Sequence, residues 1–174
     1  MKRTYKHKKS RKYRYSWFIL TFVIAVLLIV LRIPYIRDSP ELSEDITVNR
    51  VIDGDTIELS DGTTVRMIGV DTPESVHPDQ SRNSREGKTA SEWTHNLLSG
   101  EKVRLEYDKE RTDKYGRTLA YVYYKDEMVN EMLLKKGFAK TMIIEPNIKY
   151  ADRFKRLEKQ AKQDKAGFWK DNAD

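Results

Sequence analysis

Residues 51–74 read VIDGDTIELSDGTTVRMIGVDTPE, and this stretch decides the fold. β-Branched and aliphatic residues recur on both sides of Asp61-Gly62, a dipeptide that is typical of two-residue hairpin turns. We therefore predict strands at 51–52, 56–59 and 63–70, the last of them stopped by the proline that follows.

Three acidic residues, Asp55, Asp71 and Glu74, lie at the ends of these strands, and Arg66 lies between them on the last strand. Because hairpin formation brings such ends together, we expect Asp55 and Asp71 at one pole of a sheet. Clustered carboxylates repel one another, and a bound cation is the usual relief. Each acid taken singly also fits an ordinary turn residue, since Asp is common in turns. The set with Arg66 favours a functional site.

Apolar spacing in the remaining sequence predicts the other elements. Helical periodicity predicts a helix at 84–98, and alternation predicts strands at 103–107 and 119–124. A short helix is expected from Val129. A last helix, ended by Gly167, is expected along the stripe Tyr150, Phe154, Leu157 and Ala161. Three strands, a helix, two strands and two helices predict an α+β domain: a five-stranded Greek-key barrel of the OB type with three helices.

The positive charge of the chain is concentrated at its N-terminus. The 174 residues carry a formal charge of +6, with 33 basic and 27 acidic residues. Residues 1–16 contain eight Lys or Arg and no acid, so residues 17–174 carry 25 basic against 27 acidic side chains, a charge of about −2. The high pI therefore belongs to this tail and is no argument for nucleic-acid binding by the rest.

An apolar run, WFILTFVIAVLLIVL at residues 17–31, follows the basic tail. As a helix it would span about 22 Å, and extending it to residue 36 approaches the ~30 Å hydrocarbon core of a bilayer. We predict one transmembrane signal anchor at 17–36. The tail at 1–16 would be cytoplasmic, because basic flanks stay inside, and the domain would be extracellular. A cleavable signal peptide is the alternative, although no A-x-A-like site follows the run.

Residues 37–45 are polar and are interpreted as a linker, so that the globular domain covers 46–174. The chain has no cysteine, which excludes disulfides and thiolate metal sites. His7, His77 and His95 have no partners at the spacing of metal ligands, so we expect none of them to bind a metal.

The chemistry of the acidic set points to phosphate esters. Two carboxylates and a backbone carbonyl form an all-oxygen site that suits Ca²⁺ or Mg²⁺ and not Zn²⁺. Glu74 could then take a proton from a nearby water. Arg66 and Arg117 can converge, and a guanidinium binds phosphate oxygens two at a time. Together these groups indicate phosphodiester hydrolysis by metal-assisted attack of water.

Several motifs resemble the staphylococcal nuclease (thermonuclease) family closely, from about Ile46 to the C-terminus. They occur in the family's order and with nearly its spacing. The matching segments are VIDGDT at 51–56, Arg66 with VDTPE at 70–74, HP at 77–78, RTDKYGR at 111–117, MVNE at 128–131, FW at 168–169 and DNAD at 171–174.

The resemblance implies an OB-fold barrel with three helices and Ca²⁺-dependent cleavage of DNA and RNA by a monomeric catalytic domain, here a membrane-anchored homologue. It implies that Asp55, Asp71 and the carbonyl of Thr72 hold Ca²⁺. Glu74 would be the general base, and Arg66 and Arg117 would bind the scissile phosphate. Lys114 and Tyr115 would contact a neighbouring phosphate.

One departure lies between Lys140 and Pro146, where the family has two tyrosines that line its nucleotide pocket and this chain has Ile143 and Glu145. We expect altered affinity or base preference, because stacking contributes about 1–3 kcal/mol per base. Two alternatives remain: a non-catalytic OB-fold module that binds nucleic acid at the membrane surface, and a surface protein whose acids hold a structural Ca²⁺. Release of the domain as a secreted form is also compatible with the sequence.

Overall fold

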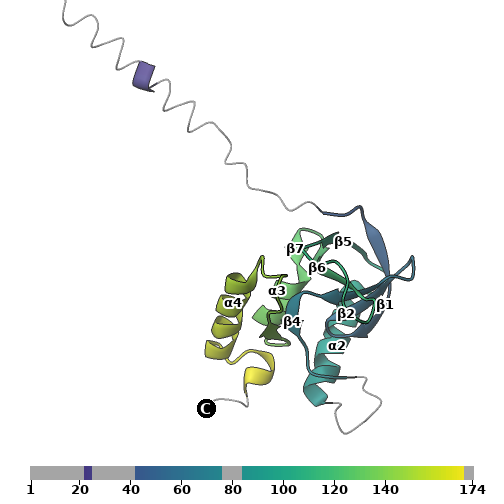
Figure 1. Cartoon of the computed structure of the whole chain (residues 1–174). Coiled ribbons are helices and arrows are strands. Elements are labelled where there is room, and N and C mark those ends of the chain that lie inside the picture. The colour runs from purple at the N-terminus through teal and green to yellow at the C-terminus, as the bar shows by residue number, and fades with distance from the viewer. Residues whose placement is uncertain (1–21, 25–41, 76–83, 171–174) are drawn as a thin grey trace, which may run out of the picture. The chain divides into compact units, whose positions relative to one another are not determined.

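The computed structural model describes residues 22–24, 42–75 and 84–170. The chain divides into two compact units, residues 1–39 and 40–174. Within its described residues the second unit contains eight strands, three α-helices and a short 3₁₀ helix (Figure 1). The strands are β1 (Ile46–Asp53), β2 (Thr56–Leu59), β3 (Thr64–Met67), β4 (Gly69–Asp71), β5 (Lys102–Glu106), β6 (Thr118–Tyr124), β7 (Glu127–Met128) and β8 (Lys140–Met142). The helices are α2 (Arg85–Leu98), α3 (Val129–Lys135), α4 (Ala151–Gln163) and η2 (Gly167–Lys170).

Five of the strands form a closed barrel, as predicted. Antiparallel pairing runs in the order β3-β2-β1-β5-β6, and a parallel pairing of β3 with β6 closes the ring. The hairpin at Asp61-Gly62 is present, with Glu58 opposite Thr64. In the closing pair, Arg66 is in register with Leu119. The barrel therefore places Arg66 beside the start of β6, which follows Arg117.

The core fills the barrel and continues under the helices. Val65 and Val122 from the barrel and Leu133 from α3 are fully buried, as is Phe154 from α4. Tyr121 on β6 is buried as well. The helices α3 and α4 contact each other and cover the side of the barrel from which β4 leaves.

The strand predicted at 63–70 is in fact two strands, and the prediction was wrong at this point. Gly69 has a φ of +77°, a conformation that favours glycine, and the chain turns at Ile68, between the end of β3 at Met67 and the start of β4. The buried amide of Asn130 donates to the carbonyl oxygen of Ile68 at 2.8 Å, which satisfies the group released by the break. Beyond the break β4 leaves the barrel and pairs with β8, a strand that the sequence did not predict.

The predicted helix at 84–98 is confirmed as α2, whose N-cap Ser84 accepts a hydrogen bond from the backbone of Gly87. The last helix ends earlier than predicted. It stops at Gln163, and Gly167, with a φ of +53°, begins η2 instead of capping α4.

The predicted anchor at 17–36 lies outside the described residues except for 22–24, which are helical. The tail at 1–16 and His77 lie outside them altogether. Within 22–24, 42–75 and 84–170, no helix combines the length and apolar character that crossing a membrane requires.

Replacing Gly69 by alanine should destabilise the fold more than the same change at Gly100. A Cβ at Gly69 would lie 2.7 Å from the Phe154 ring, whereas one at Gly100, with a nearly identical φ of +76°, would meet nothing within 4 Å. Both variants bear the backbone strain, but only Gly69→Ala overpacks the core. Overpacking should lower its free energy of unfolding by a further amount of about 1–3 kcal/mol. The free energies of unfolding are measured by denaturant titration. Equal decreases for Gly69→Ala and Gly100→Ala would contradict the close packing of Gly69 against Phe154.

Candidate active site

The tight turn between β1 and β2 places Asp55 inside the protein, where only 4% of the residue is exposed. Its Oδ2 accepts hydrogen bonds from the backbone N–H of Thr72 at 2.7 Å and from the Thr72 hydroxyl at 3.0 Å. The buried hydroxyl of Thr94 on α2 donates to the carbonyl oxygen of Gly54 at 2.8 Å. The turn is thus fixed both to the end of β4 and to α2.

Arg66 lies between two carboxylates. Its Nη1 is 2.6 Å from Oδ2 of Asp55, and its Nη2 is 2.8 Å from Oδ1 of Asp71. Nη1 also donates to the carbonyl oxygen of Val70 at 3.0 Å. Because Arg66 is itself buried, the guanidinium holds the two acids at one pole of the barrel against their mutual repulsion. Asp55 and Asp71 therefore share one pole, as expected from the sequence, and Arg66 lies between them.

The acids of this pole keep uncompensated negative charge. Burial raises the pKa of Asp53 despite hydrogen bonds from Ser75 and Gly54, and the charges of Asp55 and Glu74 raise it further. Burial also raises the pKa of Asp71, with Arg66 opposing the shift and Asp55 adding to it. Both carboxyls therefore bind protons more readily than ordinary aspartates do, mainly because burial disfavours their charged form.

Glu74 lies exposed at the edge of the same pole, and α2 holds its backbone. Its carbonyl oxygen accepts a hydrogen bond from the N–H of Ser84 at 3.0 Å. Gly87, buried in the first turn of α2, packs directly on this segment: a Cβ there would lie 2.2 Å from the Glu74 carbonyl oxygen. Neither Gly87 nor Thr94 was identified from the sequence, because nothing local links α2 to residues 54 and 74.

Asp113 organises the loop that carries the second arginine. Its Oδ1 accepts from the backbone N–H groups of Tyr115 and Arg117, and its Oδ2 accepts from Nε of Arg117 at 2.7 Å. The terminal Nη groups of Arg117 make no hydrogen bond within the described residues. Lys114 and Tyr115 are both exposed, and the Arg117 guanidinium carbon lies 5.4 Å from the centre of the Tyr115 ring. The loop thus exposes the charged groups of Lys114 and Arg117 and the phenol ring of Tyr115 to solvent.

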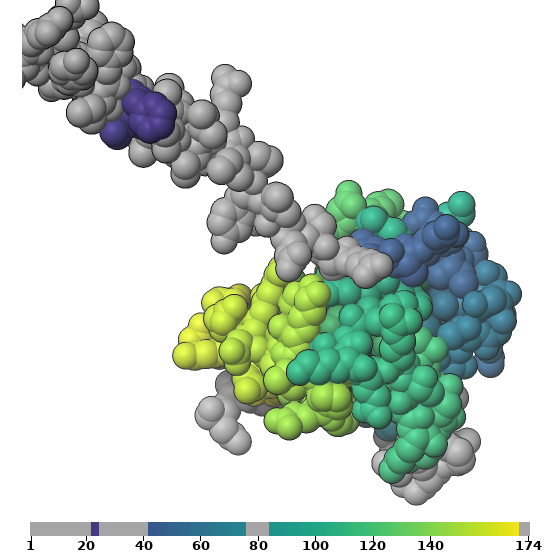
Figure 2. Space-filling view, turned by 45° about the horizontal axis from the view of Figure 1, so that its top comes forward, coloured from purple at the N-terminus to yellow at the C-terminus, as the bar shows by residue number. Residues whose placement is uncertain are grey.

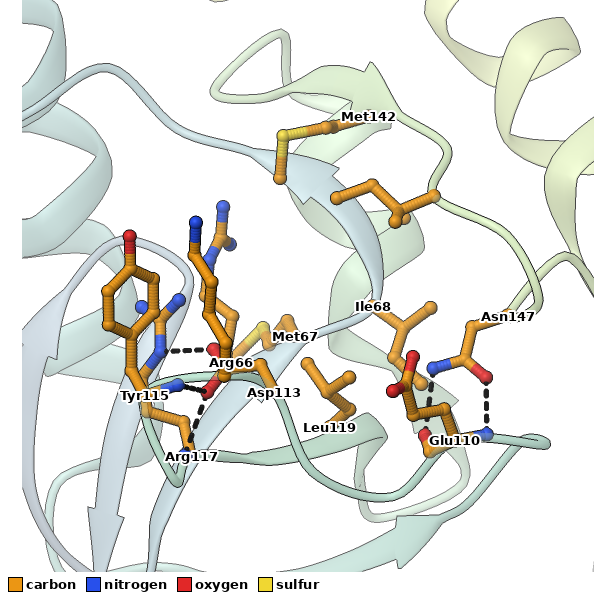
Figure 3. A pocket seen from close by; sticks show the side chains of 13 residues that line it. Arg66, Met67, Ile68, Glu110, Asp113, Tyr115, Arg117, Leu119, Met142 and Asn147 are labelled. Atoms are coloured by element: carbon orange, nitrogen blue, oxygen red, sulfur yellow. Dashed lines mark hydrogen bonds and ion pairs between the residues drawn. The ribbon is translucent and has the colours of Figure 1, made fainter.

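Arg66 and Arg117 line two neighbouring cavities. One, of about 270 Å³, is acidic and is also lined by four other residues of the predicted site, Asp55, Asp71, Thr72 and Glu74, and by Asp53. The other, of about 440 Å³, has a mainly apolar wall formed by Met67, Ile68, Leu119, Met142 and Ile144. Figure 3 shows the second cavity, with Tyr115 and the two arginines at one end. An anion held by both arginines would therefore adjoin an acidic site and an apolar one.

The apolar cavity corrects one expectation from the sequence. Met142 and Ile144 line it, whereas Ile143 packs against the core and Glu145 is exposed and does not form part of the wall. The sequence could not show this, because shifting an irregular segment by one residue exchanges the side chains that face inwards.

The apolar cavity is closed at its other end by a reciprocal pair of hydrogen bonds. Asn147 accepts from the Glu110 backbone N–H and donates to the Glu110 carbonyl oxygen, both at 2.8 Å (Figure 3). This pair joins the segment after β8 to the loop before β6, so the two walls of the cavity are tied together.

The oxygen donors of the acidic cavity fit a hard divalent cation. Asp55, Asp71 and Thr72 line it, and carboxylate and carbonyl oxygens are the donors that Ca²⁺ prefers. Within the described residues, however, no three His, Asp or Glu side chains come close enough together to form a site alone. A cation here would therefore need the Thr72 carbonyl or water to complete its ligands.

Comparison with known proteins gives a consistent result. Residues 64–171 match the family described as "Staphylococcal nuclease homologue". The chain is 44% identical over 159 residues to the thermonuclease of Staphylococcus hyicus, covering 84% of this chain and 94% of that protein. It is 41% identical to the thermonuclease of Staphylococcus intermedius (87% and 95% covered) and 45% identical to endonuclease YncB of Bacillus subtilis (78% and 66% covered). The chain belongs to the staphylococcal nuclease family.

Proposed function

We propose that this chain is a nuclease that hydrolyses DNA and RNA in a Ca²⁺-dependent reaction. The observation that carries the proposal is the position of Arg66 and Arg117, which line both the acidic and the apolar cavity. A phosphodiester has an anionic centre and a nucleoside on each side. Arginine forks bind that centre, and an apolar wall suits a base. The thermonuclease and endonuclease relatives support the same reaction class.

In this mechanism Asp55, Asp71 and the Thr72 carbonyl would hold Ca²⁺, which when bound neutralises the phosphate and makes a nearby water more acidic. Glu74 accepts the proton of the attacking water, since it is exposed at the rim and free of ion pairs within the described residues. The water oxygen forms the new bond to phosphorus, and the bond to the leaving ester oxygen breaks. Arg66 and Arg117 stabilise the charge that develops on the phosphate oxygens. Lys114 and Tyr115 contact a neighbouring phosphate.

Glu74→Gln and Arg117→Gln should each lower kcat by a factor of about 10² or more, because they remove the base and a charge-stabilising group. The melting temperature should change little, since Glu74 is exposed and the Arg117 side chain is one-third exposed. The measurement is cleavage of a single-stranded oligonucleotide in Ca²⁺ and in EGTA, with Glu127→Gln on exposed β7 as the control. Cleavage in EGTA would contradict the metal dependence, and strand binding without cleavage would favour the non-catalytic module.

Gly87→Ala should lower kcat about tenfold to a hundredfold although Gly87 touches no substrate, because a displaced base loses its alignment with the reacting water. The new methyl group would push the carbonyl of Glu74 away from α2. Lys88→Ala, at the neighbouring exposed position, is the control. Both rates should be measured well below the melting temperatures, and equal rates would show that the backbone contact does not position Glu74.

We further propose that residues 17–36 anchor the chain in the cell membrane, with residues 1–16 in the cytoplasm and the nuclease domain outside. The apolar run and the eight basic residues that precede it support this arrangement. Protease added to intact cells should then remove the domain. Degradation only after the cells are permeabilised would contradict this topology, and recovery of a shortened active chain from the medium would indicate release.

A further inference from the structure

Charge is unevenly divided within the globular domain. Residues 46–134 carry 12 basic and 17 acidic side chains, a formal charge of −5. Residues 135–170, which include β8, α4 and η2, carry 11 basic and four acidic side chains, a charge of +7. The net charge of the globular domain is near zero, but its C-terminal segment is strongly basic. The proposed reaction does not use this basic segment.

The basic segment begins beside the acidic cavity. In the pairing of β4 with β8, Lys140 stands opposite Asp71. The exposed Lys140 ammonium is 5.7 Å from the centre of the Trp169 ring, and the Lys162 ammonium of α4 is 4.5 Å from the same ring. Two cations therefore share one aromatic side chain. This arrangement links the edge of the active site to α4.

Three lysines continue along one flank of α4. Lys155, Lys159 and Lys162 are spaced i, i+4 and i+7, so they lie on the same side of the helix over about 10 Å. One edge of this flank borders β8, since Glu158, which pairs with Lys162 at 2.8 Å, accepts a hydrogen bond from the Thr141 N–H. We call Lys140, Lys155, Lys159 and Lys162 the lysine row. The yellow-green atoms of α4 lie on the surface of the domain in Figure 2.

Most of the lysine row has no counter-charge. Lys140, Lys155 and Lys159 form no ion pair within the described residues, and all three are exposed. Like charges one helical turn apart repel one another, so this spacing does not stabilise the free helix. A polyanion that tracks the flank would remove the repulsion and release counterions.

We propose that the lysine row binds the phosphates of a nucleic-acid strand beyond the bond that is cleaved, an inference that rests on the proposed function. Its continuity with Asp71 favours the substrate strand over a separate partner. The substrate class is then a strand of several nucleotides, held at the active site by Arg66 and Arg117 and along α4 by lysines. Such contacts strengthen binding without touching the reacting atoms, so they act on KM and not on kcat.

The test uses the full-length chain in a non-ionic detergent. The variant Lys140→Gln/Lys155→Gln/Lys159→Gln is compared with Lys88→Gln/Lys102→Gln/Lys125→Gln, which removes the same charge from exposed positions outside the lysine row. For a single strand of about 20 nucleotides, the first variant should raise KM about tenfold with unchanged kcat. The slope of log affinity against log salt should fall in magnitude by about 2, at about 0.7 per lost phosphate contact. Cleavage of a dinucleotide should be unchanged.

Equal KM values for the two triple variants on the long strand would overturn the proposal. So would a salt slope that does not change, or a first variant that loses only its binding to phosphatidylserine vesicles. If the wild-type chain cleaves neither substrate in Ca²⁺, the proposed function fails by itself. Fluorescence anisotropy of the labelled strand then decides about the lysine row separately: weaker binding by the first variant alone supports it, and equal binding overturns it.

Discussion

The contact of Arg66 with Asp55 and Asp71 is the interaction on which the site depends. A buried guanidinium alone, or two clustered carboxylates alone, would be unfavourable, and each compensates the other at distances of 2.6 and 2.8 Å. The compensation is incomplete, because one guanidinium faces two carboxylates while Asp53 and Glu74 line the same cavity. The ion pairs therefore allow these charged groups to be buried in the folded protein, and the remaining negative charge still attracts cations. This residual negative charge is what the proposed binding of a cation beside a phosphate would require.

Two buried polar side chains that line neither cavity keep this pole in shape. Thr94 fixes the turn before Asp55 from α2. Asn130 bonds both the N–H of Val122 on β6 and the carbonyl oxygen of Ile68, so it joins the barrel wall to the point where β4 departs. Each of these residues satisfies backbone groups that would otherwise be buried without partners. They fix the backbone segments from which the residues of the predicted site extend.

Local patterns in the sequence were sufficient for the five strands of the barrel and for the acidic pole. The Asp61-Gly62 turn and the alternating strands are local signals, and hairpin geometry brings Asp55 near Asp71 without further information. The break at Gly69 was missed because Val70 continues the β-branched pattern, and only the ring of Phe154 and the amide of Asn130 show why the chain turns there. The strand β8 and the cavity wall of Met142 and Ile144 depend on pairing with a distant segment. No local pattern encodes that register.

The parallel pairing of β3 with β6 has a consequence for how the protein acquires activity. It aligns Arg66 with Leu119, two residues beyond Arg117, so the two arginines come together only when the first and last regions of the barrel meet. Contacts between segments so far apart in sequence carry a large loop-closure entropy and form late in folding. The proposed phosphate-binding pair therefore depends on closure of the barrel and not on any local segment of the chain.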